Sequence, residues 1–178
     1  MSQSFPQING NEDVLVLWES GVHFTHSFCD IPTGAMFNSI LLPVDGSEES
    51  MNAAAMAVEI AAKFDATIDA LYVTERYPVY TKQGGSILSQ DQVLDEEHAY
   101  AEQVLADVEA IASESDVQFT GTVSTGQPSY VITEYAEKEG VDAIVLGKSG
   151  RSGLSERVIG STAERVCRNA PITTIAVP

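Results

Sequence analysis

The chain has 178 residues, and 26 Asp and Glu against 9 Lys and Arg give it a formal net charge of -17. So negative a chain repels polyanions, which argues against nucleic acid or an anionic membrane as its main partner and favours a solvated acidic surface. With 44% hydrophobic residues it can bury one good core, and no apolar run approaches the roughly 18 residues of a membrane span. Because residues 1–35 contain no Lys or Arg, we expect no secretory signal and a cytoplasmic protein.

Residues 1–35 differ from the rest of the chain. They carry a short apolar run, Val14–Trp18, without a sustained period, whereas a regular pattern begins at Met36. We therefore expect an N-terminal extension over residues 1–35 and a single domain over residues 36–178. Two explanations of the extension stay open, a genuine segment of the protein and an overlong gene model.

One group of soft metal ligands lies in this extension. His23, His26 and Cys29 follow one another at three-residue intervals. A closed zinc site needs four ligands, and no partner pair is visible, so we predict no metal site in the protein.

From Asn38 onward, apolar runs alternate with helical patterns. The first strand is predicted over Ser39–Val44, and Ser47 is a good N-cap for the helix that follows, with Glu48 and Glu49 in its first turn. That helix ends near Asp65. The remaining elements follow in chain order: a strand over Thr67–Thr74, an irregular connection with Pro78, Gly84 and Gly85, an amphipathic helix from about Asp91 to Glu114, a strand over Val117–Ser124, a helix opened by Pro128 and closed by Gly140, a strand over Asp142–Gly147, a helix over Ser161–Ala170 and a strand over Ile172–Val177.

The order βαβαβαβαβ, with continuously apolar central strands, is typical of a parallel sheet covered on both faces. We predict one doubly wound α/β domain with a five-stranded parallel sheet, strand order 3-2-1-4-5, and helices on both faces. Such sheets bind ligands at the carboxyl ends of the strands, where the strand order reverses. Two motifs lie at strand carboxyl ends, PVDGS after the first strand and GKSGRSG after the fourth.

The segment after the fourth strand has the composition of an anion-binding loop. Gly147 and Gly150 allow the backbone to turn and its N–H groups to approach a ligand, and Gly160 precedes Ser161 and Thr162 at the start of a helix, where free N–H groups carry a partial positive charge. Residues 148–168 also hold five of the nine basic residues and are net +3, with the basic side chains at Lys148, Arg151, Arg157, Arg165 and Arg168. This predicts a cradle for a small anion; a bare connecting turn is the simpler alternative.

The spacing G-x2-G-x9-G-S, from Gly147 through Gly150 to Gly160 and Ser161, occurs together with ILLPVDGSEES near residue 40 and APITTIAVP at the end. In these motifs the chain resembles the universal stress protein family, specifically its ATP-binding branch, over residues 36–178. The resemblance implies that Asp45 lies near a ribose, that backbone at Val73 meets adenine, and that Pro43 and Val44 wall the base.

The same resemblance implies that Gly147, Gly150, Gly160, Ser161 and Thr162 receive the ribose and phosphates of ATP, usually with a divalent ion such as Mg2+. Lys148 is a further candidate for phosphate contact, as a point charge. For Asp45 a second role stays open, an Asx-turn or cap with Ser47, and the two roles can coexist. The family commonly forms dimers, often through the last strand, here Ile172–Val177.

Three functions follow, in order of preference. The first is an ATP-binding regulatory protein of the stress response, with AMP as an alternative ligand, no dedicated catalytic residue, and at most slow hydrolysis or autophosphorylation. The second is an enzyme that cleaves ATP or transfers adenylate or phosphate, with Ser149, Ser152 or Ser161 as acceptor. The third is an interaction scaffold that binds no nucleotide.

Overall fold

The computed structural model describes residues 37–75, 90–150 and 159–178, with the side chains of residues 90–95 excepted. Several sequence predictions fall outside these residues, namely those on the extension over residues 1–35 with His23, His26 and Cys29, on the connection with Pro78, Gly84 and Gly85, and on Arg151, Ser152 and Arg157.

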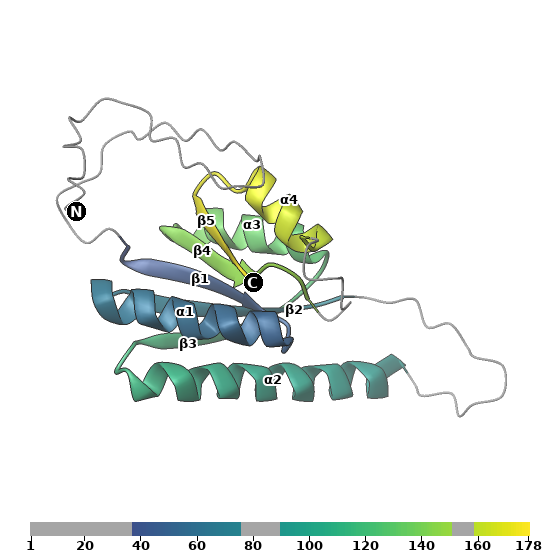
Figure 1. Cartoon of the computed structure of the whole chain (residues 1–178). Coiled ribbons are helices and arrows are strands. Elements are labelled where there is room, and N and C mark those ends of the chain that lie inside the picture. Colours follow the sequence, from purple (N-terminus) through teal and green to yellow (C-terminus); the bar gives the residue numbers. More distant parts are fainter. Residues whose placement is uncertain (1–36, 76–89, 151–158) are drawn as a thin grey trace, which may run out of the picture. The chain divides into compact units, whose positions relative to one another are not determined.

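Five strands form one parallel sheet in the order β3-β2-β1-β4-β5. The strands are β1 (Ser39–Val44), β2 (Thr67–Thr74), β3 (Phe119–Thr125), β4 (Ala143–Gly147) and β5 (Thr173–Val177). This confirms the predicted fold class and strand order. The chain moves outward from β1 to β3, then crosses back to place β4 on the other side of β1 (Figure 1).

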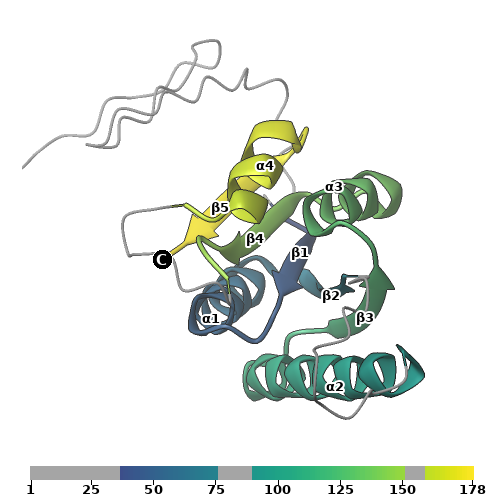
Figure 2. The same cartoon turned by 90° about the vertical axis from the view of Figure 1, so that its right-hand side faces the viewer.

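In the part of the chain that the structure describes, four helices cover the sheet, two on each face: α1 (Glu48–Phe64), α2 (Gln90–Glu114), α3 (Pro128–Glu139) and α4 (Ser161–Asn169). The view along the sheet in Figure 2 shows α1 and α2 on one side of the strands and α3 and α4 on the other. Among the described residues, no helix combines the length and apolar character needed to cross a bilayer.

The alternation of side chains along the central strand builds two separate cores. Ile40, Leu42 and Val44 of β1 are buried with α1 and α2 in one cluster. Leu41, between them in the sequence, is buried in the other cluster with Ile132 of α3. Because both faces of β1 are buried, its sequence is continuously apolar instead of alternating with polar residues.

Local signals fix most element ends. Ser47 caps α1 as predicted, since its Oγ accepts from the Ser50 N–H at 3.2 Å. The helix ends at Asp65, whose φ is 57° and whose N–H donates to the Ala61 carbonyl, and Gly140 ends α3 in the same left-handed conformation with a φ of 67°. A side chain is disfavoured there, which suits glycine at position 140.

The third strand begins two residues later than the sequence predicts. Asp116 has a φ of 54°, and the Val117 N–H donates to the Ala112 carbonyl at 3.1 Å. Val117 therefore completes the end of α2 and does not join the sheet. Val117, an apolar residue, suits burial under a helix end as well as in a strand, which is why the pattern extended the strand too far.

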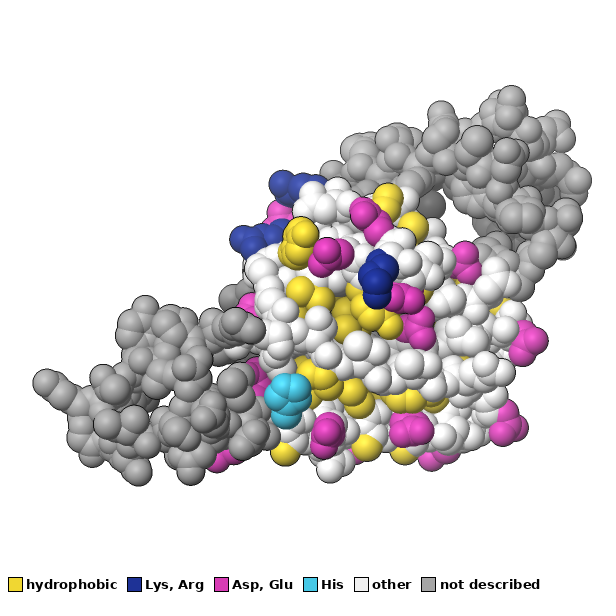
Figure 3. Space-filling view, turned by 180° about the vertical axis from the view of Figure 1, so that it is seen from behind, with side chains coloured by type: hydrophobic (Ala, Val, Ile, Leu, Met, Phe, Trp, Pro, Cys, Tyr) yellow, Lys and Arg dark blue, Asp and Glu magenta, His cyan; other side chains and the backbone are white. Residues whose placement is uncertain are grey.

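The acidic composition is visible on the surface. Figure 3 shows carboxylate side chains spread over one face of the described part, with few Lys and Arg among them and a hydrophobic area between them. Among the described residues, surface ion pairs join Lys138 to Glu139 and Arg168 to Glu164. Exposed pairs of this kind contribute little to stability, so the fold depends on its two apolar cores.

Candidate functional site

The strand order reverses between β1 and β4. The ladder between β1 and β2 runs the whole length of β1, from Ser39 to Val44. The ladder between β1 and β4 covers the pairs Ile40–Ala143 and Leu41–Ile144 and ends two residues before Pro43, which has no N–H to donate. The two central strands therefore part toward their carboxyl ends, at the position where doubly wound sheets bind ligands.

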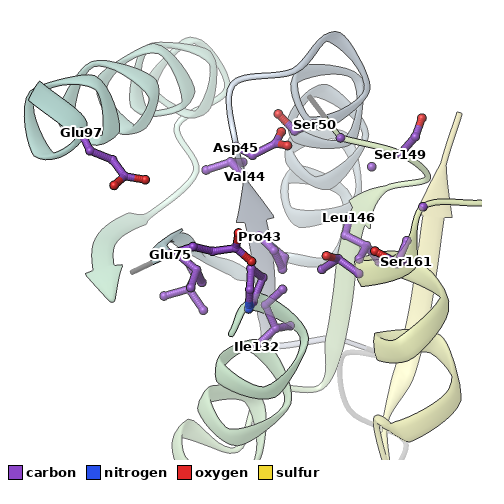
Figure 4. A pocket seen from close by; sticks show the side chains of 18 residues that line it. Pro43, Val44, Asp45, Ser50, Glu75, Glu97, Ile132, Leu146, Ser149 and Ser161 are labelled. Carbon is purple, nitrogen blue, oxygen red and sulfur yellow. The ribbon is translucent and has the colours of Figure 1, made fainter. Parts of the chain in front are cut away.

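A cavity of about 270 Å³ lies at this point (Figure 4). Its size is close to the lower end of the range for small-molecule sites, about 300–1,000 Å³. Its described lining comes from β1, β2, β4 and all four helices or the turns beside them, and consists of Pro43, Val44, Asp45, Ser50, Leu71, Val73, Glu75, Glu97, Pro128, Ile132, Leu146, Gly147, Ser149, Gly150, Gly160, Ser161, Thr162 and Ala163.

The structure brings together all the residues that the sequence nominated for nucleotide binding except Lys148. Pro43, Val44, Asp45, Val73, Gly147, Gly150, Gly160, Ser161 and Thr162 all line the cavity, whereas Lys148 is not in its described lining. The Lys148 N–H donates to the Val177 carbonyl at 2.6 Å and so continues the β4–β5 ladder by one residue. A contact between the Lys148 ammonium and phosphate stays a prediction.

Sequence reasoning missed the residues that reach the cavity from other elements. Leu71 could have been found, because it points to the same face of β2 as Val73, two residues later. Ile132 of α3 and Glu97 of α2 carry no local signal, since their places depend on how the helices pack. Figure 4 shows Ile132 below the tip of β1, and Glu97 on α2 at the other side of the view from Ser149 and Ser161.

The glycines of the loop are needed for close packing within the protein. At Gly147, a Cβ would lie 2.9 Å from the backbone of Glu49 and of Ser50 in the first turn of α1. At Gly160, it would lie 3.2 Å from the Ser149 Cα and 3.3 Å from the Lys148 carbonyl oxygen, to which the Gly160 N–H donates. We expected Gly147 to supply a sharp turn and Gly150 a second close approach of the backbone, but the described glycines with a positive φ are Gly46, Gly126 and Gly140.

A hydrogen bond fastens the loop to the same helix. Ser149 is buried, and its Oγ donates to Glu49 Oε1 at 2.9 Å. Together with the close approach of Gly147, this bond fixes the backbone of the loop against the start of α1. The loop is therefore held in shape by the first βα turn.

Asp45 connects the same two segments. Its Oδ1 accepts from the Ser47 N–H at 3.0 Å and from the Ser47 hydroxyl at 2.6 Å, which confirms the Asx-turn that the sequence allowed. Its Oδ2 lies beside Gly150, where a Cβ would come within 2.5 Å. Asp45 thus lines the cavity while it shapes the β1–α1 turn.

The start of α4 differs from the starts of α1 and α3. Ser47 caps α1 and Gln127 caps α3 through their side chains. The N-cap residue of α4 is Gly160, which has no side chain, and within the described residues no side-chain hydrogen bond caps this helix. The first N–H groups of α4 therefore face the cavity region with the partial positive charge of the helix. Such a terminus suits an anion.

The cavity combines this donor-rich side with carboxylates and an apolar wall. Asp45, Glu75 and Glu97 supply the carboxylates, and Pro43 and Leu71 are part of the apolar wall. Among the described residues, no group of three or more His, Cys, Asp or Glu side chains is arranged to hold a metal ion. The arrangement fits a ligand with a flat apolar part, hydrogen-bond donors and an anionic end.

A sequence model of the universal stress protein family matches residues 36–178. The chain belongs to this family. It is similar to a universal stress protein of Methanocaldococcus jannaschii, with 36% identity over 146 residues that cover 80% of this chain and 84% of the relative. The solved structure of a universal stress protein from Lactobacillus plantarum matches with 30% identity and a TM-score of 0.69, over 80% of this chain and 98% of that one.

Two solved structures of more distant universal stress proteins contain nucleotides. One is described in complex with cAMP; it has 20% identity and a TM-score of 0.60, over 79% of this chain and 96% of its own. The other, from Archaeoglobus fulgidus, is described in complex with dAMP and has 17% identity and a TM-score of 0.57, over 80% of this chain and 99% of its own. At these identities the likeness to the present chain is one of fold.

Proposed function

We propose that this universal stress protein binds an adenine nucleotide, ATP or AMP, in the cavity between β1 and β4, and that the bound nucleotide regulates its interactions in the cytoplasm during stress. The observation that carries the proposal is the uncapped start of α4 facing a cavity at the switch point of the sheet. The neighbours in complex with cAMP and dAMP support it, because they show that the fold can accommodate an adenine nucleotide.

The lining suggests how the nucleotide would lie. The base would rest on the apolar wall made by Pro43, Val44 and Val73, and the ribose would lie near Asp45. The phosphates would take the free N–H groups at Ser161 and Thr162, with Gly147 and Gly150 on the facing loop. Gly160 would lie beside them, since its own N–H donates to the Lys148 carbonyl. A preformed donor set of this kind needs little rearrangement, which favours binding.

A divalent ion, if it accompanies the nucleotide, would be held chiefly by the phosphates. Among the described residues, no three carboxylates are arranged to hold it, and the Ser161 and Thr162 hydroxyls are neutral oxygens beside the proposed phosphate site. Mg2+ is commonly held in this way, with few protein ligands and several phosphate oxygens. The ion would neutralise phosphate charge in a strongly acidic protein.

For the regulatory role we propose a homodimer that forms through Ile172–Val177. β5 lies at one end of the sheet order, and within the described residues it pairs with β4 alone. An edge strand with an open row of N–H and C=O groups can pair with a second copy of itself. Since the Val177 carbonyl also accepts from the Lys148 N–H, this edge is connected to the proposed nucleotide loop.

Substitution of Ser161 by Asp tests the binding site. A carboxylate in the first turn favours the helix but repels phosphate, so Ser161→Asp should weaken AMP binding by at least about tenfold in calorimetry without lowering the melting temperature. Thr120→Asp, which adds the same charge at an exposed position in β3 outside the described cavity lining, is the control. If the wild-type protein binds neither AMP nor ATP, or if Ser161→Asp binds AMP normally, the proposal fails.

A second candidate function is phosphoryl transfer to Ser149. The bond from Ser149 Oγ to Glu49 Oε1 pairs a hydroxyl with a carboxylate that can take its proton. In that reaction Ser149 Oγ bonds to the γ-phosphorus of ATP, the bond to ADP breaks, and the proton passes to Glu49. Mass spectrometry after incubation with ATP and magnesium would find phosphate on Ser149, absent in Ser149→Ala and reduced in Glu49→Gln.

A further inference from the structure

The proposed nucleotide cavity is unusually acidic for a site that receives phosphates. Three carboxylates line it, at Asp45, Glu75 and Glu97, and its described lining contains no Lys or Arg. They come from the ends of β1 and β2 and from α2, so they surround the ligand from several elements. Figure 4 shows Glu97 across the view from Ser149 and Ser161, on the far side from the proposed phosphate site.

Packing of α2 onto the first βα turn brings Glu97 to the cavity. One turn along the helix, the Tyr100 ring meets the buried Tyr72 ring edge-on, with the centroids 6.2 Å apart. The Tyr100 hydroxyl also fills the place that a side chain at Gly46 would occupy. Residues three apart share a helix face, so this contact turns Glu97 toward the cavity as well.

The carboxylates act on the phosphates over a short range. A cavity of about 270 Å³ is roughly 8 Å across if it is taken as a sphere. That is no more than the Debye length at physiological salt, about 8 Å, so solvent ions do not fully screen a charge on one wall from a charge at the other. Each additional negative charge on a ligand therefore weakens its binding.

We propose that Glu97, assisted by Glu75, selects nucleotides by charge, so that the cavity prefers a monophosphate or a magnesium-bound polyphosphate to a free polyphosphate. The inference rests on the proposed function, and it assigns to α2 a part in ligand choice. Glu97 acts here as a specificity-determining residue that need not touch the phosphates. Asp45 adds to the same field, but its bonds to Ser47 make it unsuitable for substitution.

The size of the effect follows from Coulomb's law. One carboxylate and one negative charge of the ligand, roughly 8 Å apart, repel each other. This repulsion lowers the affinity by about 2.4-fold in unscreened water and by about 1.4-fold with salt screening. Free ATP carries about two more negative charges than AMP. Glu97→Gln should therefore improve the affinity for free ATP relative to AMP by about two- to sixfold, and Glu75→Gln/Glu97→Gln by about 4- to 30-fold.

Calorimetry of the full chain tests this with AMP, with ATP in EDTA and with ATP in excess magnesium. The matched control is Glu102→Gln, which removes the same charge from an exposed position on α2 outside the described cavity lining. We expect Glu97→Gln to increase the affinity for free ATP relative to that for AMP, and to increase the affinity for magnesium-bound ATP less. In 0.5 M salt the effect on both affinities should disappear.

The outcomes separate this inference from the proposed function. If the wild-type protein binds AMP and ATP but Glu97→Gln changes both affinities by the same factor, the charge selection is overturned and nucleotide binding stands. A shift of the same size in Glu102→Gln overturns it too, because net charge would then explain the change. If the wild type binds no nucleotide, both proposals fall together.

Discussion

The substitution Gly147→Ala should destabilise the protein, because the added Cβ would clash with the backbone of α1. An added Cβ would lie 2.9 Å from the Glu49 carbonyl carbon and from the Ser50 nitrogen, and 3.0 Å from the Glu49 oxygen. These atoms belong to the first turn of α1, which Ser47 caps, so relief requires a shift of the helix or of the loop. Overpacking of this kind costs about 1–3 kcal/mol.

For a protein of this size, about 2–4 °C of melting temperature is lost per kcal/mol, so Gly147→Ala should melt roughly 2–12 °C lower. Gly150→Ala is the matched control, because its Cβ would meet only the end of the Asp45 side chain, at 2.5 Å, and that carboxylate can rotate. Both changes restrict the unfolded chain equally. Differential scanning calorimetry measures the two losses. Equal losses, or a Gly147→Ala variant as stable as the wild type, would refute the packing argument.

Three further outcomes are expected. Ser149→Ala and Glu49→Ala each remove the same 2.9 Å hydrogen bond, so urea unfolding should show about 1–2 kcal/mol lost in each single variant and little further loss in the double variant; additive losses would count against the bond. Burial raises the pKa of the Asp69 carboxyl above its ordinary value of 3.8, against the opposing hydrogen bond from Ser39 and with a further rise from nearby Glu139. The folded state thus favours the protonated acid, and the stabilisation from that preference is lost as the pH rises above 3.8, so Asp69→Asn should raise the melting temperature at pH 7 but not below 3.8; an equal gain at every pH would contradict the argument. Burial also raises the pKa of the Cys167 thiol above 9.0, so iodoacetamide at pH 8 should label Cys167 more slowly in the folded protein than in urea, as peptide mass spectrometry would show; equal rates would be inconsistent with burial.

Much of the fold could be predicted because its signals are local. β1 and β2 have the predicted bounds, since the apolar runs Ile40–Val44 and Ala70–Val73 stop at or next to polar residues. Ser47 and Gly140 mark helix ends through cap chemistry that a few neighbouring residues determine. The predicted start of β3 was wrong because the left-handed conformation at Asp116 determines where the strand begins. The apolar side chain of Val117 fits the end of α2 and a strand equally well, so the pattern could not distinguish them.

The candidate site divides in the same way. Residues at the carboxyl ends of strands, such as Asp45 directly after β1 and Gly147 at the end of β4, were identified from motifs because parallel strands bring these ends to one edge. Glu97 and Ile132 could not be identified from motifs, since the packing of α2 and α3 brings them to the cavity. No local pattern predicts the Ser149–Glu49 hydrogen bond, because it joins residues 100 positions apart.

The most direct test of nucleotide binding at the switch point is an amide NMR titration with AMP. The largest shifts of the assigned N–H signals should fall on Gly150, Gly160, Ser161 and Thr162, with smaller shifts near Val73, because the phosphate would bind the exposed start of α4. Unchanged signals at Ser161 and Thr162, or shifts confined to the opposite end of the sheet near Asp65 and Asp116, would contradict it.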